Sequence, residues 1–265
     1  MTAHVKAEVL LKAEGVNLSL SGKPILRDIN FSIKNIIRPG VLQGQVVTLI
    51  GRSGIGKTQL FKILSGLQQP GSGRVTINNN KTVKAGDMGV IFQNYYLFEW
   101  RTVYTSMMLA AKQNKALQGK EKESIEKYVT EFGLADIMLQ YPAQLSGGQK
   151  QRVSIIQQLL KGSDFLLLDE PFSGLDVCML DKVVDLLLQV SLSDELKTLI
   201  IVSHDIPTAV AISDTVFILG CEPGLPGATI RKEIDLIERD LAWQKDLKKS
   251  KNFLETLDEI KSCLQ

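Results

Sequence analysis

The sequence has little of several features that would point to a function class at once. It has three cysteines and two histidines among 265 residues, and its formal net charge is only +2. A charge this small gives no indication of a nucleic-acid partner. No apolar run in the sequence approaches the roughly 20 residues that span a bilayer. Any role at a membrane is therefore expected to come through a partner.

The few cysteines also fit no binding pattern. Cys178, Cys221 and Cys263 are scattered and match no metal-binding spacing. Residues 1–14 carry charges among short apolar runs and lack the continuous apolar core of a signal peptide. We therefore expect free thiols in a reducing compartment.

The clearest motif that is present is a glycine loop between a strand-like run and a helix-forming segment. Residues 46–50 are mostly apolar, and residues 59–64 favour a helix. The loop itself reads Gly51-Arg52-Ser53-Gly54-Ile55-Gly56-Lys57-Thr58. Its glycines let amide N–H groups close around phosphate oxygens, and the helix start adds its positive dipole end. The context predicts a P-loop that binds a nucleoside triphosphate, with Lys57 at the β- and γ-phosphates and the Thr58 hydroxyl on Mg²⁺.

The remaining patterns predict an α/β fold. Residues 9–20 and 29–33 alternate apolar with polar residues, which predicts an antiparallel pair of half-buried strands before the P-loop. Between residues 103 and 141 the apolar spacing becomes helical. From residue 165 onward, strand-like runs alternate with helical segments, which favours a mainly parallel sheet. Residues 233–265 are predicted to be helical, with an apolar stripe that includes Phe253, Leu257 and Ile260.

Two adjacent carboxylates follow one of the strand-like runs. Residues 165–168 are continuously apolar, as in a strand buried on both faces, and Asp169 and Glu170 come at its end. Ligands of α/β sheets gather at the carboxyl ends of strands. Asp169 is thus a candidate for holding Mg²⁺, and Glu170 for polarising a water that attacks the γ-phosphate. A purely structural capping role is the alternative for this pair.

A second glycine motif opens a predicted helix. It reads Leu145-Ser146-Gly147-Gly148-Gln149, so a hydroxyl and two glycines stand at a helix N-terminus, which can bind an anion. Taken alone, these residues could be an ordinary helix cap. Together with the P-loop, the motif resembles the LSGGQ signature of the ATP-binding-cassette (ABC) ATPases. The resemblance covers roughly residues 9–219.

This resemblance implies further site residues. Gln93 matches the glutamine of the family that contacts Mg²⁺ and the attacking water. Asp176 matches the loop that joins the two halves of a dimer, and His204 matches the histidine that touches the γ-phosphate. The family usually has an aromatic residue that stacks on adenine, and this position falls at Leu20. Leucine offers no π face, so the base preference stays open.

The resemblance also implies the architecture and the dimer. It implies an α/β P-loop NTPase core with a mainly parallel sheet, an N-terminal antiparallel β subdomain and an inserted helical subdomain at about residues 100–160. We expect a single ATPase domain over residues 1–240 and a helical tail over residues 241–265. Two such cassettes pack head to tail in the family, with ATP between them. The signature residues would then act on the nucleotide of a second copy or a homologous cassette: Ser146, Gly147, Gly148 and Gln149.

With one cassette and no spanning segment, the chain resembles the ATPase subunit of a transporter. Such a subunit docks on separate permease subunits at the cytoplasmic face of the membrane. The segment after Gln93 resembles the docking region of bacterial importers, and its Trp-x-Thr-Val pattern at residues 100–103 resembles the nitrate, sulfonate and taurine import ATPases. This predicts import of a small solute, with a solute-binding protein as a further partner. A soluble cassette ATPase of the iron–sulfur cluster assembly type is the alternative.

Four aromatic residues lie close together in this docking-like segment. They are Tyr95, Tyr96, Phe98 and Trp100. Core packing would explain them, but four aromatics in so short a loop favour a protein interface.

Overall fold

The computed structural model describes residues 4–38, 43–78, 80–173, 177–192, 197–242, 247 and 250–264. Within these ranges, ten strands form one sheet in the order β5-β4-β1-β2-β10-β9-β3-β8-β7-β6. The strands are β1 (Val5–Leu20), β2 (Lys23–Ile37), β3 (Gln45–Gly51), β4 (Ser72–Ile77), β5 (Lys81–Thr82), β6 (Gly89–Ile91), β7 (Phe165–Asp169), β8 (Thr198–Ser203), β9 (Thr215–Cys221) and β10 (Ala228–Asp235).

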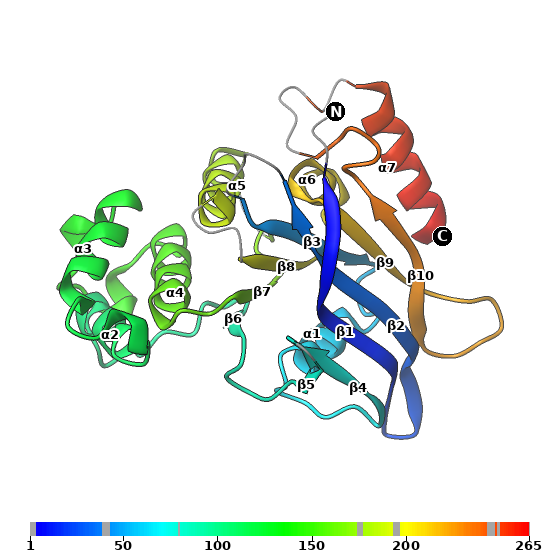
Figure 1. Ribbon diagram of the computed structural model, residues 1–265, viewed down its shortest axis with the longest axis horizontal. Coiled ribbons are helices and arrows are strands. Elements are labelled where there is room, and N and C mark those ends of the chain that lie inside the picture. The colour runs from blue at the N-terminus through cyan, green and yellow to red at the C-terminus, as the bar shows by residue number, and fades with distance from the viewer. Residues whose placement is uncertain are drawn as a thin grey trace.

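Helices cover the sheet and also form a lobe at one side of it (Figure 1). The helices are α1 (Lys57–Leu64), α2 (Val103–Ala111), α3 (Glu121–Glu131), α4 (Gly147–Lys161), α5 (Val177–Leu192), α6 (Ile206–Ile212) and α7 (Lys251–Leu264). Short 3-10 turns lie at Lys115–Leu117, Ala135–Ile137 and Pro142–Gln144. No helix of the described ranges combines the length and apolarity that a membrane crossing needs.

The half of the sheet that carries the P-loop is parallel. β9, β3, β8, β7 and β6 pair in parallel along this half. Successive side chains of each strand point to opposite faces of the sheet. Leu49 packs in one core with Phe61 of α1, whereas Ile50 packs in another core with Val210 of α6. Strands buried on both faces need apolar residues at nearly every position. The predicted mainly parallel sheet is confirmed.

The other half of the sheet is antiparallel, as the sequence predicts. β1 and β2 form a long hairpin, and β4 and β5 extend it. The hairpin is longer than the alternating segments at 9–20 and 29–33, since pairing continues to Val5 opposite Ile37. These two outer residues are 59% and 49% exposed. Strand ends with little burial show weak alternation, which is why the pattern underestimates their length.

The helical lobe is inserted between β6 and β7. It holds α2, α3 and α4, which share one core that includes Met107, Ile125, Ile156 and Leu166 of β7. The last helix, α4, ends at Gly162, whose φ of 80° is a common helix stop. The lobe is therefore tied to the sheet through α4.

The prediction of one helix over residues 233–265 is wrong at its start. Residues 228–235 form β10, which pairs antiparallel with β9, and Ile234 lies opposite Val216. A strand is more favourable than a helix there because it lets inward-facing residues, such as Ile234 at 1% exposure, pack in the core under the sheet. The helix α7 begins only at Lys251, and its apolar stripe of Phe253, Leu257 and Ile260 is buried as expected.

An ion-pair cluster fastens α7 to β10. Glu259 lies 2.6 Å from Arg239 and 2.5 Å from Lys232 of β10. Hydrogen bonds from Arg239 and then Lys232 lower the pKa of Glu259 to about 2. A folded-state pKa below the unfolded value means that this carboxylate stabilises the fold above about pH 4.5 and stops doing so as the pH falls toward 2.

We expect Glu259→Gln to lower the free energy of unfolding at pH 7 by about 1 kcal/mol, a modest value because the side chains are partly exposed to solvent. The deficit should shrink as the pH falls from about 4.5 toward 2, because the Glu259 carboxylate is then protonated first in the unfolded chain and finally also in the fold. Urea unfolding at several pH values measures both effects. The matched control is Glu255→Gln, whose ion pair with Lys251 on the same helix is exposed. A deficit that stays constant with pH would contradict the assignment.

Candidate functional site

The P-loop joins β3 to α1 at the carboxyl edge of the parallel strands. β3 ends at Gly51, and Gly56 is the N-cap of α1 with a φ of 109°. Gly54 has a φ of 77°, and both values lie in the left-handed region that favours glycine. A Cβ atom at Gly56 would also lie 3.0 Å from the Ile25 side chain of β2. The loop therefore needs its glycines both for backbone conformation and for close packing.

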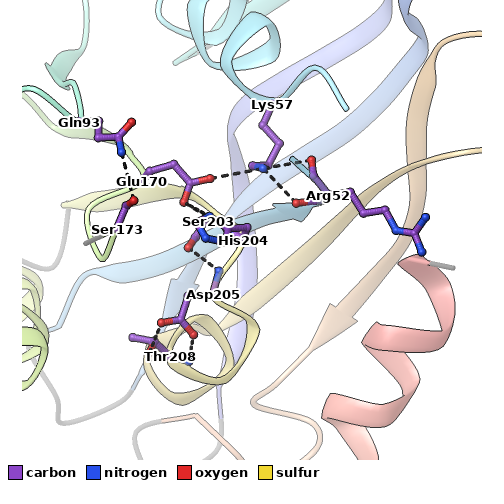
Figure 2. A network of polar contacts seen from close by, with 10 residues as sticks. Arg52, Lys57, Gln93, Glu170, Ser173, Ser203, His204, Asp205 and Thr208 are labelled. Atoms are coloured by element: carbon purple, nitrogen blue, oxygen red, sulfur yellow. Dashed lines mark hydrogen bonds and ion pairs between the residues drawn. The ribbon is translucent and has the colours of Figure 1, made fainter. Parts of the chain in front are cut away.

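Lys57 is held across the mouth of this loop (Figure 2). Its Nζ atom donates to the carbonyl oxygens of Gly51 at 3.0 Å and Arg52 at 3.2 Å. It also lies 3.4 Å from Oε1 of Glu170, and its side chain is only 7% exposed. Ser53 and Gly54 of the same loop are exposed, and Ile55 is half-buried. The ammonium group is thus fixed between the glycine loop and the end of β7.

Asp169 and Thr58 form a second part of the site. Asp169 ends β7, is buried, and accepts a hydrogen bond from the Thr58 side chain. Burial and the neighbouring charge of Glu170 raise the pKa of Asp169, against the opposing influence of Lys57 and Thr58. Its Oδ1 atom is buried without a protein partner. A carboxylate oxygen beside a hydroxyl is a donor set that suits Mg²⁺, which takes further ligands from phosphates and water.

No larger metal centre is present: the described residues contain no group of three or more His, Cys, Asp or Glu placed to hold an ion. Thr58 and Asp169 therefore fit an ion that a nucleotide helps to hold.

Glu170 and His204 meet at the same edge of the sheet. Oε2 of Glu170 lies 2.8 Å from Nδ1 of His204 and accepts its backbone N–H at 3.2 Å. The two residues come together because β7 and β8 are parallel neighbours that end side by side. Glu170 has a φ of 51°, and its backbone N–H donates to Val202 at 2.8 Å. A non-glycine residue in this conformation is strained, and such strain concentrates at functional sites.

Gln93 and Ser173 complete the cluster in Figure 2. Gln93, which follows β6, donates from Nε2 to Oγ of Ser173 at 3.1 Å. Ser173 belongs to the loop after Glu170, where its N–H donates to the Glu170 carbonyl at 3.2 Å. Asp176, the predicted dimer residue of this loop, lies outside the described residues.

The signature residues lie on the helical lobe. Oγ of Ser146 accepts from the Gln149 N–H at 3.3 Å, and Oε1 of Gln149 accepts from the Ser146 N–H at 2.8 Å. This reciprocal capping box starts α4. Ser146 and Gly147 are exposed, and Gly148 is half-buried. Figure 1 shows α4 in the lobe at the side of the sheet, whereas α1, which follows the P-loop, packs on β3, β7 and β8 of the sheet.

Leu20 ends β1 at the tip of the hairpin and is 40% exposed. Its side chain is therefore accessible, and its contact with a nucleotide base stays a prediction.

Sequence reasoning missed a residue that connects the lobe to the loop after Glu170. Gln151 of α4 is 1% exposed and donates from Nε2 to the Pro171 carbonyl at 3.3 Å. Nothing local distinguishes this glutamine from its solvent-facing neighbours.

Comparison with known proteins now decides the family. The family model described as "ABC transporter" matches residues 35–173, which include the P-loop, Gln93, the signature and Glu170. The chain belongs to the ABC transporter family. Its similarity to the taurine import ATP-binding protein TauB of Pelagibacter ubique is 31% identity over 242 residues, 89% of this chain and 85% of that protein.

A second relative and a solved structure support the same family. The chain is 31% identical over 246 residues to the nitrate import ATP-binding protein NrtD of Synechocystis, covering 91% of this chain and 88% of that protein. Among solved structures, cbiO1 from Clostridium perfringens, part of the ABC transporter complex cbiONQ, superposes with a TM-score of 0.70 at 26% identity, over 88% of this chain and 90% of that one. The predicted ABC ATPase fold is confirmed, and the chain is an ATP-binding subunit with ATPase activity.

For this ABC ATPase we expect Gln151→Leu to lower kcat about tenfold and leave the KM for ATP unchanged. The change removes one buried hydrogen bond to the loop that positions Glu170, but no contact to the P-loop. Steady-state ATPase assays give both constants. Ser154→Ala, on the same buried face of α4, is the matched control and should change kcat less than about twofold. Equal losses of kcat in both variants would indicate a general effect on α4.

Proposed function

We propose that this chain is the ATP-hydrolysing subunit of an importer of small solutes, and that it works as a head-to-tail dimer on separate permease subunits. The observation that supports the dimer is the division of the site between two parts of the chain. Lys57, Asp169, Glu170 and His204 gather at one sheet edge, whereas the exposed signature starts a helix of the lobe. A site divided in this way becomes complete only when a second cassette supplies the missing part.

Within one half-site, each residue has a proposed role. The loop amides and Lys57 bind the β- and γ-phosphates, because both present N–H groups at the start of α1. Glu170 acts as general base: it accepts a proton from the attacking water, while the His204 backbone N–H and ring orient its carboxylate. His204 is half exposed, which leaves its ring accessible to a γ-phosphate.

Magnesium fits the same half-site. Thr58 and Asp169 would hold the ion, and Gln93, two residues after β6, would contact it. Bound there, Mg²⁺ would neutralise charge that develops on the phosphates. The buried, unpartnered Oδ1 atom of Asp169 supports this assignment.

The other half-site comes from the partner. Ser146, Gly147, Gly148 and Gln149 would contact the γ-phosphate side of the nucleotide bound by the partner cassette. The support is the N-terminus of α4, a 15-residue helix whose N-cap Ser146 and first residue Gly147 are exposed. Unpaired N–H groups and a positive dipole end favour an anion at such a helix start.

An exposed aromatic patch supports docking on a permease. We define the aromatic patch as Tyr96, Phe98, Trp100, Leu139 and Tyr141, which are 73%, 42%, 73%, 81% and 46% exposed. Backbone hydrogen bonds from Val103 to Gln140 and from Tyr104 to Met138 place the two segments of the patch side by side. Tyr95 instead turns inward, and burial raises its pKa to about 12. A large apolar and aromatic patch on a protein surface marks an interaction site.

Import is inferred from the relatives, two of which are named for the import of taurine and nitrate. A small anion of the nitrate, sulfonate or taurine kind is therefore the proposed cargo, delivered by a solute-binding protein. The proposed location is the cytoplasmic face of the membrane, where ATP is available. The iron–sulfur assembly type of ATPase is the alternative that the experiment below separates.

The test is a pull-down of the tagged chain from its native cells in mild detergent, with identification of the bound proteins. We expect a multi-span membrane protein and a solute-binding protein. Trp100→Ala should lose the membrane protein and keep the ATPase activity of the purified chain. Leu254→Ala, which removes an exposed leucine from α7 outside the patch, is the control. Recovery of soluble scaffold proteins alone would overturn the transporter proposal.

A further inference from the structure

A pocket adjoins the proposed catalytic residues on the side of Glu170 that faces His204. It is open to solvent, has a volume of about 350 Å³, and its polar lining consists of Glu170, Ser173, Ser203, His204, Asp205 and Lys261. Lys57 is not part of this lining. Because Oε1 of Glu170 faces Lys57 and Oε2 faces His204, the carboxylate stands between the P-loop lysine and the pocket. The pocket is therefore next to the place where the γ-phosphate would be cleaved.

Lys261 is the unexpected member of this lining, since it comes from the C-terminal helix. The family match ends at residue 173, so α7 lies outside the matched segment. The preceding residue, Ile260, is fully buried in a core that also contains Ile50, the residue before the P-loop, and Val210 of α6. This packing holds the backbone of Lys261 in place relative to both the P-loop strand and the helix after His204.

The charges of the lining leave Lys261 available to an anion. Glu170 is already paired with Lys57 and His204, and Asp205 caps α6 by accepting from the N–H and hydroxyl of Thr208 at 3.2 and 2.8 Å. Lys261 has a 3.5 Å ion pair with Asp258, but both side chains are more than half exposed. Such exposed pairs contribute little and are easily exchanged.

The hydroxyl groups of the pocket add hydrogen-bond donors. Oγ of Ser203 accepts from the Asp205 N–H, and Oγ of Ser173 accepts from Gln93. Each oxygen acts as an acceptor in these contacts, so each O–H group can still donate to a ligand. A lysine, two hydroxyls and an imidazole around one pocket suit a small oxyanion with several oxygens.

We propose that this pocket receives the inorganic phosphate product and that Lys261 binds it. The proposal rests on the proposed function of Glu170 and His204. In the reaction, the water oxygen bonds to the γ-phosphorus, the bond to the bridging oxygen breaks, and the water proton passes to Glu170. ADP stays on the P-loop, and the phosphate moves past the Glu170–His204 pair into the pocket. The C-terminal helix thereby supplies a residue for product release.

The experiment uses the full chain and inorganic phosphate. Lys261→Ala should raise the inhibition constant of phosphate about fivefold and Lys261→Glu further, while Lys261→Arg should retain inhibition close to wild type. Phosphate release after a single turnover, followed with a fluorescent phosphate reporter, should change in the same variants. The hydrolysis step measured by quenched flow, and the KM for ATP, should stay within about twofold. Lys251→Ala, which changes an exposed lysine at the start of the same helix, is the matched control.

Unchanged phosphate inhibition and release in both Lys261→Ala and Lys261→Glu would overturn the proposal. A slower quenched-flow hydrolysis step with unchanged phosphate inhibition would also overturn it, because Lys261 would then act before product release. The proposed function fails by a different result: Glu170→Gln would then hydrolyse ATP at the wild-type rate, whatever Lys261 does.

Discussion

Glu170→Gln is expected to lower the ATP turnover number about a thousandfold while ATP binding changes little. Glutamine has nearly the same shape and can still accept the His204 backbone hydrogen bond, but it cannot take a proton from water. Lys57 and the glycine loop, which bind the phosphates in our proposal, are unchanged. Because the bound ATP is no longer cleaved, the variant should accumulate as an ATP-bound dimer.

Steady-state ATPase assays, ATP titration and size-exclusion chromatography with ATP measure the three effects. Glu259→Gln makes the same carboxylate-to-amide change on α7, in the ion-pair cluster with Arg239 and Lys232, and should keep turnover close to wild type. Full turnover by Glu170→Gln would remove Glu170 as the general base.

The second large effect is expected from mixing two inactive variants. Lys57→Ala removes the ammonium of the P-loop, and Ser146→Arg places a bulky cation at the start of α4, so each variant alone should lose activity at least about a hundredfold. In a head-to-tail heterodimer, the intact P-loop of one chain meets the intact signature of the other. Random mixing makes half of the dimers heterodimers with one working site of two, so about a quarter of the wild-type activity should return.

The control for this experiment is a mixture of Lys57→Ala with the Lys57→Ala/Ser146→Arg double variant. None of its dimers contains an intact P-loop, so no activity should return. If the first mixture also stays inactive although size-exclusion chromatography shows dimers, the head-to-tail arrangement is wrong.

Local sequence patterns were sufficient for the phosphate-binding parts of the site. A glycine loop with Lys57 and Thr58 depends on left-handed backbone angles and on a helix start, and both are properties of a few consecutive residues. The same is true of the capping box at Ser146. The order of these motifs along the chain was also sufficient for the ABC family, which the comparisons confirm.

Long-range pairing decided what the local patterns could not. The 2.8 Å contact between Glu170 and His204 joins residues 34 positions apart, and it exists because β7 and β8 end side by side. Residues 228–235 became a strand because β9 offered an edge to pair with. Gln151 and Lys261 carry no local signal, since a helix looks the same whether its polar residue faces water or a loop from another part of the chain.

The sequence by itself thus determined the chemistry that this protein can perform: a phosphate-binding loop, two carboxylates after a buried strand, and a second helix start for an anion. The tertiary structure alone decided which of these groups share one site and which do not. It placed Lys57 and Glu170 within 3.4 Å, put the signature on a separate lobe, and brought Lys261 of the last helix to the pocket beside His204. The physical reason is that backbone conformation and helix capping depend on neighbours in sequence, whereas burial and strand pairing depend on neighbours in space.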